Sequence, residues 1–252
     1  MLHAPKNEYD FAEYTSKRGG FGLGYEYEID APFQGAPGNS KWMSYENEDY
    51  EQEFKRSKTR RHVIRDLPNH FKVSYEELGG GMGYEIKSVV APLSIHKMIA
   101  KRYLFPNITT NNKPNGRDNG GGIHVSISRT PLTEPNHERV FDFLHRRFPA
   151  KLLSAMSERC NYSLVYCRQE EHEHNWGNHY SIINRENQNR HEFRLFAAQK
   201  HLLIPALEML DSLFAHAQTQ DPITVETWHA FTKSKLKYRE IYEHTAKALL
   251  KC

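Results

Sequence analysis

Gly24-Tyr25-Glu26-Tyr27-Glu28-Ile29-Asp30 alternates acidic residues with aromatic or aliphatic ones, which is the period of a half-buried β-strand. Residues two apart on a strand point to the same face, so Glu26 and Glu28 stand side by side. If both are buried, two like charges need a cation, and the stretch then predicts a metal-binding strand. The alternative is a surface strand with solvated glutamates, since acid pairs are common on exposed faces.

Similar alternation predicts several more strands, and amphipathic spacing predicts helices between them. Strands at 71–75 and 84–89 are expected to form a hairpin around glycines 79–81 and 83. Another strand is expected at 123–128, and a second hairpin is expected from 179–184 and 190–196. Helices are expected at 47–66, after Pro92, at 135–148 up to the break at Pro149, at 202–214 and at 228–242. Residues 105–122 are rich in Asn, Gly and Pro and predict a long loop.

This order of elements predicts an α+β fold, in which a curved antiparallel sheet carries helices on one face and the active site on the other. A chain of 252 residues with 38% hydrophobic content can bury its own core. We expect a single domain over residues 1–252, with a sheet-bearing catalytic core at 20–200 and closing helices at 200–252.

The composition bounds the function without naming it. Lys and Arg number 34 against 31 Asp and Glu, a formal charge of +3 that is too mild to indicate nucleic acid but suits anionic ligands such as nucleotides. The three cysteines are odd in number and lack CxxC spacing, which favours reduced thiols. Residues 1–10 carry charges without an apolar run, and no stretch approaches membrane-spanning length. A cytoplasmic protein without membrane contact is the expectation, and the oligomeric state stays open.

The helix-free face of the sheet would collect further polar side chains. Arg190, Glu192 and Arg194 alternate with apolar or aromatic neighbours, so one strand face carries plus, minus, plus. Glu85 and the pair His124 and Ser126 would project from other strands toward Glu26 and Glu28. Carboxylates and an imidazole suit a metal such as magnesium, and guanidinium groups suit phosphate, so the set predicts a nucleoside triphosphate site. A cross-strand salt-bridge ladder is the alternative.

The order of these motifs resembles the amidoligase family, the carboxylate-amine ligases related to glutamine synthetase and glutamate-cysteine ligase. An ExE strand is followed by an E-x-x-S strand, then by a glycine-led histidine strand and an E-x-R strand. In this chain they are Glu26-Tyr27-Glu28, Glu85-Ile86-Lys87-Ser88, Gly120-Gly121-Gly122-Ile123-His124-Val125-Ser126 and His191-Glu192-Phe193-Arg194-Leu195-Phe196. The likeness covers residues 22–200, and 221–250 resemble the family's closing helices. It implies a fold like the glutamine synthetase catalytic domain.

The resemblance also implies roles for single residues. Metal ligands would be Glu26, Glu28, Glu85, His124 and Glu192, holding two or three Mg²⁺ ions. Nucleotide phosphates would be contacted by His124, Ser126, Arg190 and Arg194, and catalysis would rest on Arg194, Glu192 and Arg190. Tyr180 and Asn184 are candidates for substrate contact. Two departures from the family pattern are Ser126, where a second histidine is usual, and Glu76-Glu77-Leu78-Gly79-Gly80-Gly81 in place of an acidic turn.

The implied activity is ATP-dependent formation of an amide bond, peptide or isopeptide-like, between a small-molecule or peptide carboxylate and an amine, through an acyl phosphate. The alternative is a catalytically inactive scaffold that binds nucleic acid or protein through the basic residues at 55–65. A metal-dependent hydrolase is a third class. Residues 170–174 with His179 could bind zinc, although a charged loop is the simpler interpretation, and nothing near Cys160 or Cys167 indicates an activated thiolate.

Overall fold

The computed structural model describes residues 11, 21–30, 71–78, 81–107, 121–159, 182–185 and 187–252. Its strands form one antiparallel sheet in the order β2-β3-β1-β4-β6-β5. They are β1 (Leu23–Asp30), β2 (Phe71–Leu78), β3 (Gly81–Ser88), β4 (Gly122–Ser128), β5 (Ile183–Asn184) and β6 (Arg190–Ala197). The chain therefore has the predicted mixture of helices with an antiparallel sheet.

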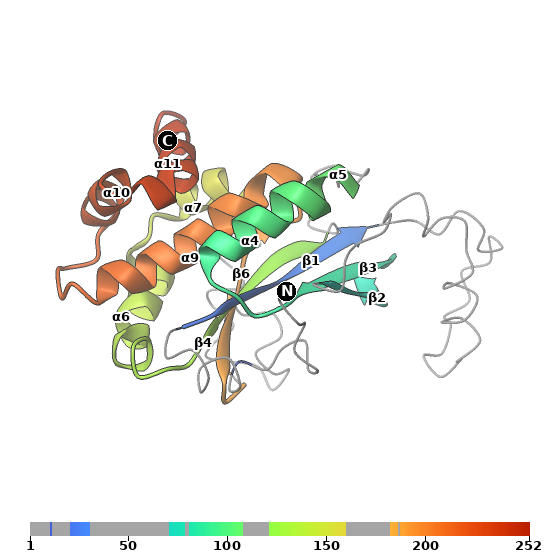
Figure 1. Cartoon of the computed structure of the whole chain (residues 1–252). Helices are drawn as coiled ribbons and strands as arrows, with labels where there is room; N and C mark the ends of the chain where they lie inside the picture. The colour runs from blue at the N-terminus through green and yellow to red at the C-terminus, as the bar shows by residue number, and fades with distance from the viewer. Residues whose placement is uncertain are drawn as a thin grey trace, which may run out of the picture.

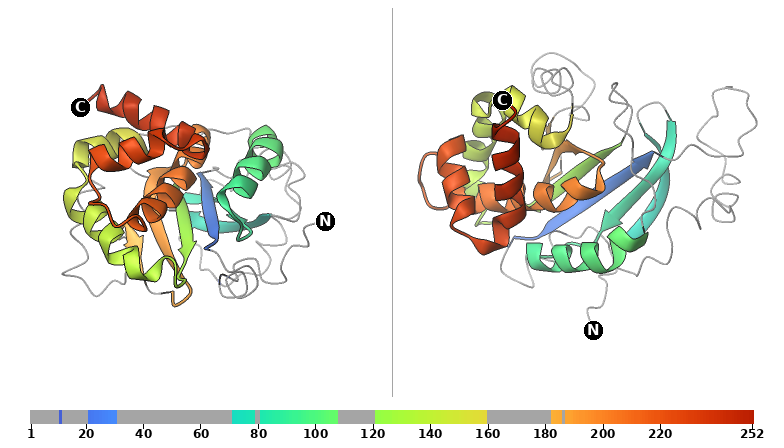
Figure 2. Two further views of the ribbon diagram at one scale, coloured as in Figure 1. Left: turned by 60° about the vertical axis from the view of Figure 1, so that its left-hand side comes forward. Right: turned by 90° about the horizontal axis from the view of Figure 1, so that it is seen from above.

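The helices form two groups along the chain, the first between β3 and β5 and the second after β6. The first group is α4 (Leu93–Ile99), η1 (Ala100–Leu104), α5 (Phe105–Asn107), η2 (Glu134–Asn136), α6 (His137–Asp142), η3 (Phe143–Arg147) and α7 (Ala150–Ser157). The second is η6 (Lys200–Leu202), α9 (Leu203–Ala217), α10 (Val225–Lys233), η7 (Leu236–Tyr238) and α11 (Arg239–Leu249). Helices α4 and α9 lie across the same side of the sheet, and α10 and α11 pack on α9 (Figures 1 and 2). No described helix has both the length and the apolar content needed to cross a membrane.

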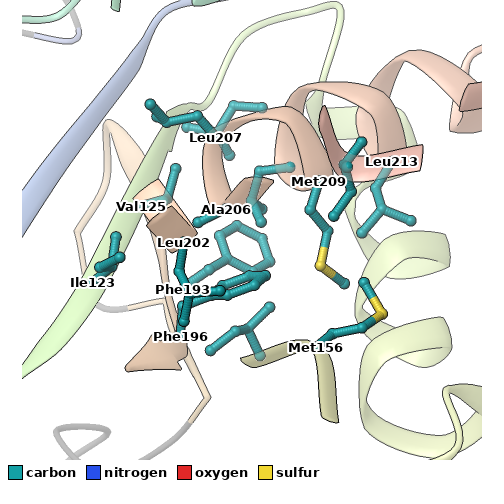
Figure 3. Close-up of a cluster of buried hydrophobic side chains, with 14 of the residues drawn as sticks. Ile123, Val125, Met156, Phe193, Phe196, Leu202, Ala206, Leu207, Met209 and Leu213 are labelled. Atoms are coloured by element: carbon teal, nitrogen blue, oxygen red, sulfur yellow. The ribbon is translucent and has the colours of Figure 1, made fainter. Parts of the chain in front are cut away.

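The alternation of the strands separates an apolar face from a polar one. Tyr25 and Tyr27 of β1 are buried in the same hydrophobic cluster as Val125 of β4 and Phe193 of β6. Figure 3 shows side chains of β4 and β6 meeting those of α9, among them Leu207. Because neighbouring residues on a strand point to opposite faces, the residues between these apolar ones face away from the helices.

Helix α7 ends close to the polar face of the sheet. Pro149 immediately precedes α7. Proline cannot continue a preceding helix, so it separates α7 from the helical segment before it. At its other end Glu158 has left-handed backbone with φ 55°, which reverses the chain. The next residue, Arg159, donates from Nη1 to the carbonyl oxygen of Arg194 on β6 at 3.1 Å.

Most predicted elements within the described residues are confirmed, but the helix expected at 228–242 is divided into α10 and α11 by η7. The hairpin of β2 and β3 spans residues 71–88 with residues 79–80 outside the described part, and β4 begins one residue before its predicted start. The loop predicted from residue 105 is wrong at its beginning, because the helical path after Pro92 continues through α5 to Asn107. The expected helix at 47–66, the possible zinc segment 170–174 and residues 179–181 lie outside the described residues.

Candidate functional site

The central strands bring the predicted acids to one face of the sheet. Glu26 of β1 lies opposite Lys87 of β3 on one side and opposite His124 of β4 on the other. Glu28 lies opposite Glu85 in the same antiparallel ladder. Directly opposed residues of antiparallel strands share a face, so these five side chains stand together on the side away from the helices.

Strands β4, β6 and β5 extend this polar face. Ser126 lies opposite Glu192, and Ser128 lies opposite Arg190. Asn184 of the short strand β5 lies on the other side of Glu192, so this predicted substrate residue borders the site. Tyr180, the other one, lies outside the described residues.

Three of the predicted ligands form a compact group that could hold a metal ion. Glu26, His124 and Glu192 are all buried, and one ligand atom from each lies within 4.8 Å of the others. His124 Nδ1 is 3.5 Å from Glu26 Oε2 and 3.8 Å from Glu192 Oε1. Among the described residues this nitrogen has no hydrogen-bond partner. The other ring nitrogen, Nε2, is 3.7 Å from Glu28 Oε2, so the imidazole stands between three carboxylates.

Cations from the strands on either side balance these acids. Lys87 Nζ is 2.6 Å from Glu85 Oε2 and 3.8 Å from Glu26 Oε1. Arg194 Nε donates to Glu192 Oε1 at 2.6 Å, and Arg190 Nη2 donates to Glu192 Oε2 at 3.3 Å. The plus, minus, plus order along β6 thus forms two ion-pair contacts within the strand. Between strands, Arg190 Nη2 lies 3.7 Å from Glu26 Oε1, a contact of the kind that a cross-strand ladder requires.

The electrostatic environment keeps Glu26 ionised. Burial raises the pKa of Glu26. The imidazole of His124 and the ammonium of Lys87 lower this pKa by more than burial raises it, so the net result is a pKa of about 2. A carboxylate with so low a pKa is available as a hard oxygen ligand at neutral pH.

Two further cations belong to the site, although the motifs of the sequence did not single them out. Lys87 follows Glu85 by two residues, so strand alternation alone would have placed it on the same face. Arg159 Nη2 lies 2.5 Å from where a Cβ on Gly122 would stand, and His124 Nε2 lies 2.9 Å from the same point. No local sequence pattern predicts that Arg159 belongs to the site, because it reaches the site through the turn that ends α7.

Two glycines at the start of β4 allow the close approach of β1. The backbone N–H of Gly122 donates to Glu28 Oε2 at 2.5 Å, which fixes that carboxylate beside His124. A Cβ on Gly121 would stand 2.4 Å from Glu28 Cβ and 2.8 Å from the Glu28 carbonyl oxygen. The three heavy atoms nearest to a Cβ on Gly122 would belong to the side chains of Arg159 and His124.

We expect Gly121→Ala to be more destabilising than Gly122→Ala. The first must displace the backbone of β1, and overpacking of this kind costs roughly 1–3 kcal/mol, whereas the nearest atoms that the second displaces are side-chain atoms of Arg159 and His124. Urea unfolding of both variants measures the difference. Equal stability of the two variants would contradict the close packing of Gly121 against Glu28.

Chemically, the site combines carboxylate oxygens and an imidazole nitrogen with guanidinium and ammonium groups. Oxygen donors suit Mg²⁺, and guanidinium groups suit phosphate oxygens. The donor set therefore fits a metal ion bound together with an anionic ligand.

Comparison with protein-family models finds no match to the chain, and comparison with curated proteins finds none either. The resemblance to the amidoligase family therefore rests on the motifs of the chain itself.

Proposed function

We propose that the protein is an ATP-dependent carboxylate-amine ligase with a fold like the catalytic domain of glutamine synthetase. One observation carries the proposal: the buried group Glu26, His124 and Glu192 lies beside the guanidinium groups of Arg190 and Arg194, on the face of the sheet that points away from the described helices. Metal ligands next to phosphate-binding groups are what a magnesium nucleotide requires.

The roles of the residues follow from their positions. Glu26, His124 and Glu192 would hold Mg²⁺, with Glu28 and Glu85 completing the set on the β1 and β3 side. Bound magnesium would supply charge neutralisation at the terminal phosphates. Arg190 and Arg194 would turn from Glu192 toward the transferred phosphoryl group, and Ser126, opposite Glu192, would contact the nucleotide.

The reaction needs ATP because a carboxylate is a poor acyl donor. Its oxygen attacks the γ-phosphorus, and ADP leaves as the acyl phosphate forms. A neutral amine then attacks the carbonyl carbon, phosphate departs with the former carboxylate oxygen, and the nitrogen loses a proton. Arg194 would stabilise the equatorial oxygens during the first transfer. Asn184 borders the site where the acid or amine would be held.

A non-catalytic scaffold is the second candidate. It is favoured by the contacts of Lys87 with Glu85 and of Arg194 with Glu192, both 2.6 Å, in which the chain's own cations already balance the acids. In such a protein the polar face would act as a salt-bridge ladder, and binding of nucleic acid or protein would use another surface.

The substitution Glu192→Gln separates the two candidates. The amide keeps the shape of the side chain but removes the charge that faces His124, Arg190 and Arg194. For a ligase we expect at least a tenfold loss of Mg²⁺-dependent ATP affinity in calorimetric titration, with folding retained. For a ladder, no nucleotide effect is expected, whereas the loss of one partner of a buried pair costs about 3–5 kcal/mol of stability in either case.

A matched control is Glu243→Gln, which removes a carboxylate from the exposed i,i+4 pair with Arg239. Neither ATP affinity nor stability should change measurably in this variant. Wild-type protein that binds no ATP in the presence of Mg²⁺ would rule out the ligase proposal.

A further inference from the structure

A second group of ligand-type side chains lies on the opposite face of β6. Glu134 of η2, His137 of α6 and His191 of β6 each place one ligand atom within 4.8 Å of the others. His137 Nδ1 is 3.6 Å from Glu134 Oε1, and His191 Nε2 is 3.7 Å from Glu134 Oε2. His191 stands between Arg190 and Glu192 in the sequence, so strand alternation turns it away from the carboxylate group described above.

His191 is a buried imidazole aimed into this group. Its side chain is 1% exposed, and neither ring nitrogen has a hydrogen-bond partner among the residues that the structure describes. The Phe141 ring meets it edge to face at 5.0 Å, which fixes the plane of the imidazole. A buried, unpartnered nitrogen of this kind is costly unless something binds it.

The other two side chains are oriented by neighbours, as metal ligands usually are. Arg129 donates to both oxygens of Glu134, at 3.3 and 3.1 Å, and a carboxylate oxygen has a second lone pair left for another partner. His137 Nε2 lies 3.1 Å from Glu138 Oε1, which leaves Nδ1 as the nitrogen that faces Glu134 and His191. Nδ1 of His137 also has no hydrogen-bond partner within the described part of the chain.

We propose that Glu134, His137 and His191 form a binding site for a divalent transition-metal ion of the zinc class. Two imidazoles and one carboxylate are a ligand set that zinc accepts, with a fourth position for water. Ligand atoms of a tetrahedral zinc site lie roughly 3.3 Å apart, given bonds of about 2.0–2.1 Å. His137 Nδ1 lies 3.6 Å from Glu134 Oε1, and His191 Nε2 lies 3.7 Å from Glu134 Oε2, both close to that separation.

The site would serve the fold rather than the proposed ligase chemistry. It joins β6 to the segment η2–α6 that follows β4, and the sheet separates it from Glu26, His124 and Glu192. Metal bound to the folded protein alone stabilises it, so zinc should raise the melting temperature.

Titration of the chelator-treated full chain with Co²⁺ and then Zn²⁺ tests the proposal. We expect the wild type to take up one more equivalent than His137→Ala or Glu134→Gln, with visible Co²⁺ absorption that Zn²⁺ displaces. Removing an outer partner with Glu138→Ala should weaken affinity about 10- to 100-fold. His201→Ala, which removes an exposed imidazole 2.7 Å from Glu158, is the matched control and should bind like the wild type.

Equal metal uptake by the wild type, His137→Ala and Glu134→Gln, each shown to be folded by circular dichroism, would overturn the proposal. Wild-type affinity in Glu138→Ala, whose side chain is exposed enough to be removed without unfolding, would also count against it. The two proposals fail separately, because wild-type protein that binds no ATP with Mg²⁺ but takes up the zinc equivalent would overturn only the ligase proposal.

Discussion

Replacement of Arg194 by alanine is expected to lower ATP turnover by about 10³- to 10⁵-fold, the range typical of an arginine that stabilises phosphoryl transfer. The guanidinium donates from Nε to Glu192 Oε1 at 2.6 Å, and its side chain stays 15% exposed at the edge of the metal-ligand group. If it turns from Glu192 to the nucleotide, its charge would offset the charge of the transferred phosphoryl group. ADP release should be measured with the carboxylate and amine that stimulate the wild type most.

Two further variants show whether the loss arises from the guanidinium itself. Arg194→Lys keeps the charge but not the planar fork, so we expect it to recover only a small part of the rate. Arg146→Ala removes a guanidinium that is 77% exposed and pairs with Asp142 at 3.6 Å, and it should retain full turnover. Wild-type ADP release by a folded Arg194→Ala protein would refute the role of Arg194 in phosphoryl transfer.

Glu26→Gln is expected to remove a large, acid-sensitive part of the stability. Folding lowers the pKa of Glu26 from 4.5 to about 2, so the folded state favours its ionised form. This contribution is present above pH 4.5 and is lost as the pH falls through the window toward 2. From the size of the shift it amounts to roughly 3 kcal/mol. The wild type should therefore lose more stability than Glu26→Gln over that window.

Urea unfolding between pH 6 and pH 3 in the presence of chelator measures this difference without a contribution from metal binding. Glu240→Gln, which disrupts an ion pair with the 56% exposed Lys101, is the control for the loss of one carboxylate. In Mg²⁺ titrations, Glu26→Gln should also bind nucleotide at least tenfold more weakly. Parallel stability curves for the wild type and Glu26→Gln would show that Glu26 is not held ionised by its neighbours.

Strand alternation made much of the candidate site predictable. Side chains two apart share a face because of the backbone geometry alone, so the sequence is enough to place Glu26 with Glu28, and Arg190 with Glu192 and Arg194. The same rule applied to Glu85 would have included Lys87. Glycine and proline positions likewise predicted the β2–β3 hairpin and the break before α7.

Strand order and register came only from the tertiary structure, because they depend on pairing between segments far apart in the chain. That pairing placed His124 opposite Glu26 and Ser126 opposite Glu192, and it drew the acids into one buried group. Arg159 reaches the group through a turn with φ 55° at Glu158, which no periodic pattern encodes.

The sequence by itself determined which residues share a face of each strand, since a period of two is a local property of the extended chain. Only the tertiary structure decided which of those faces meet, and on which side of the sheet. It therefore brought His191 to Glu134 and His137 on the helix side, and Glu192, the next residue, to Glu26 and His124 on the other. Adjacent residues of one strand thus belong to two different candidate metal sites, because packing between distant segments supplies their partners.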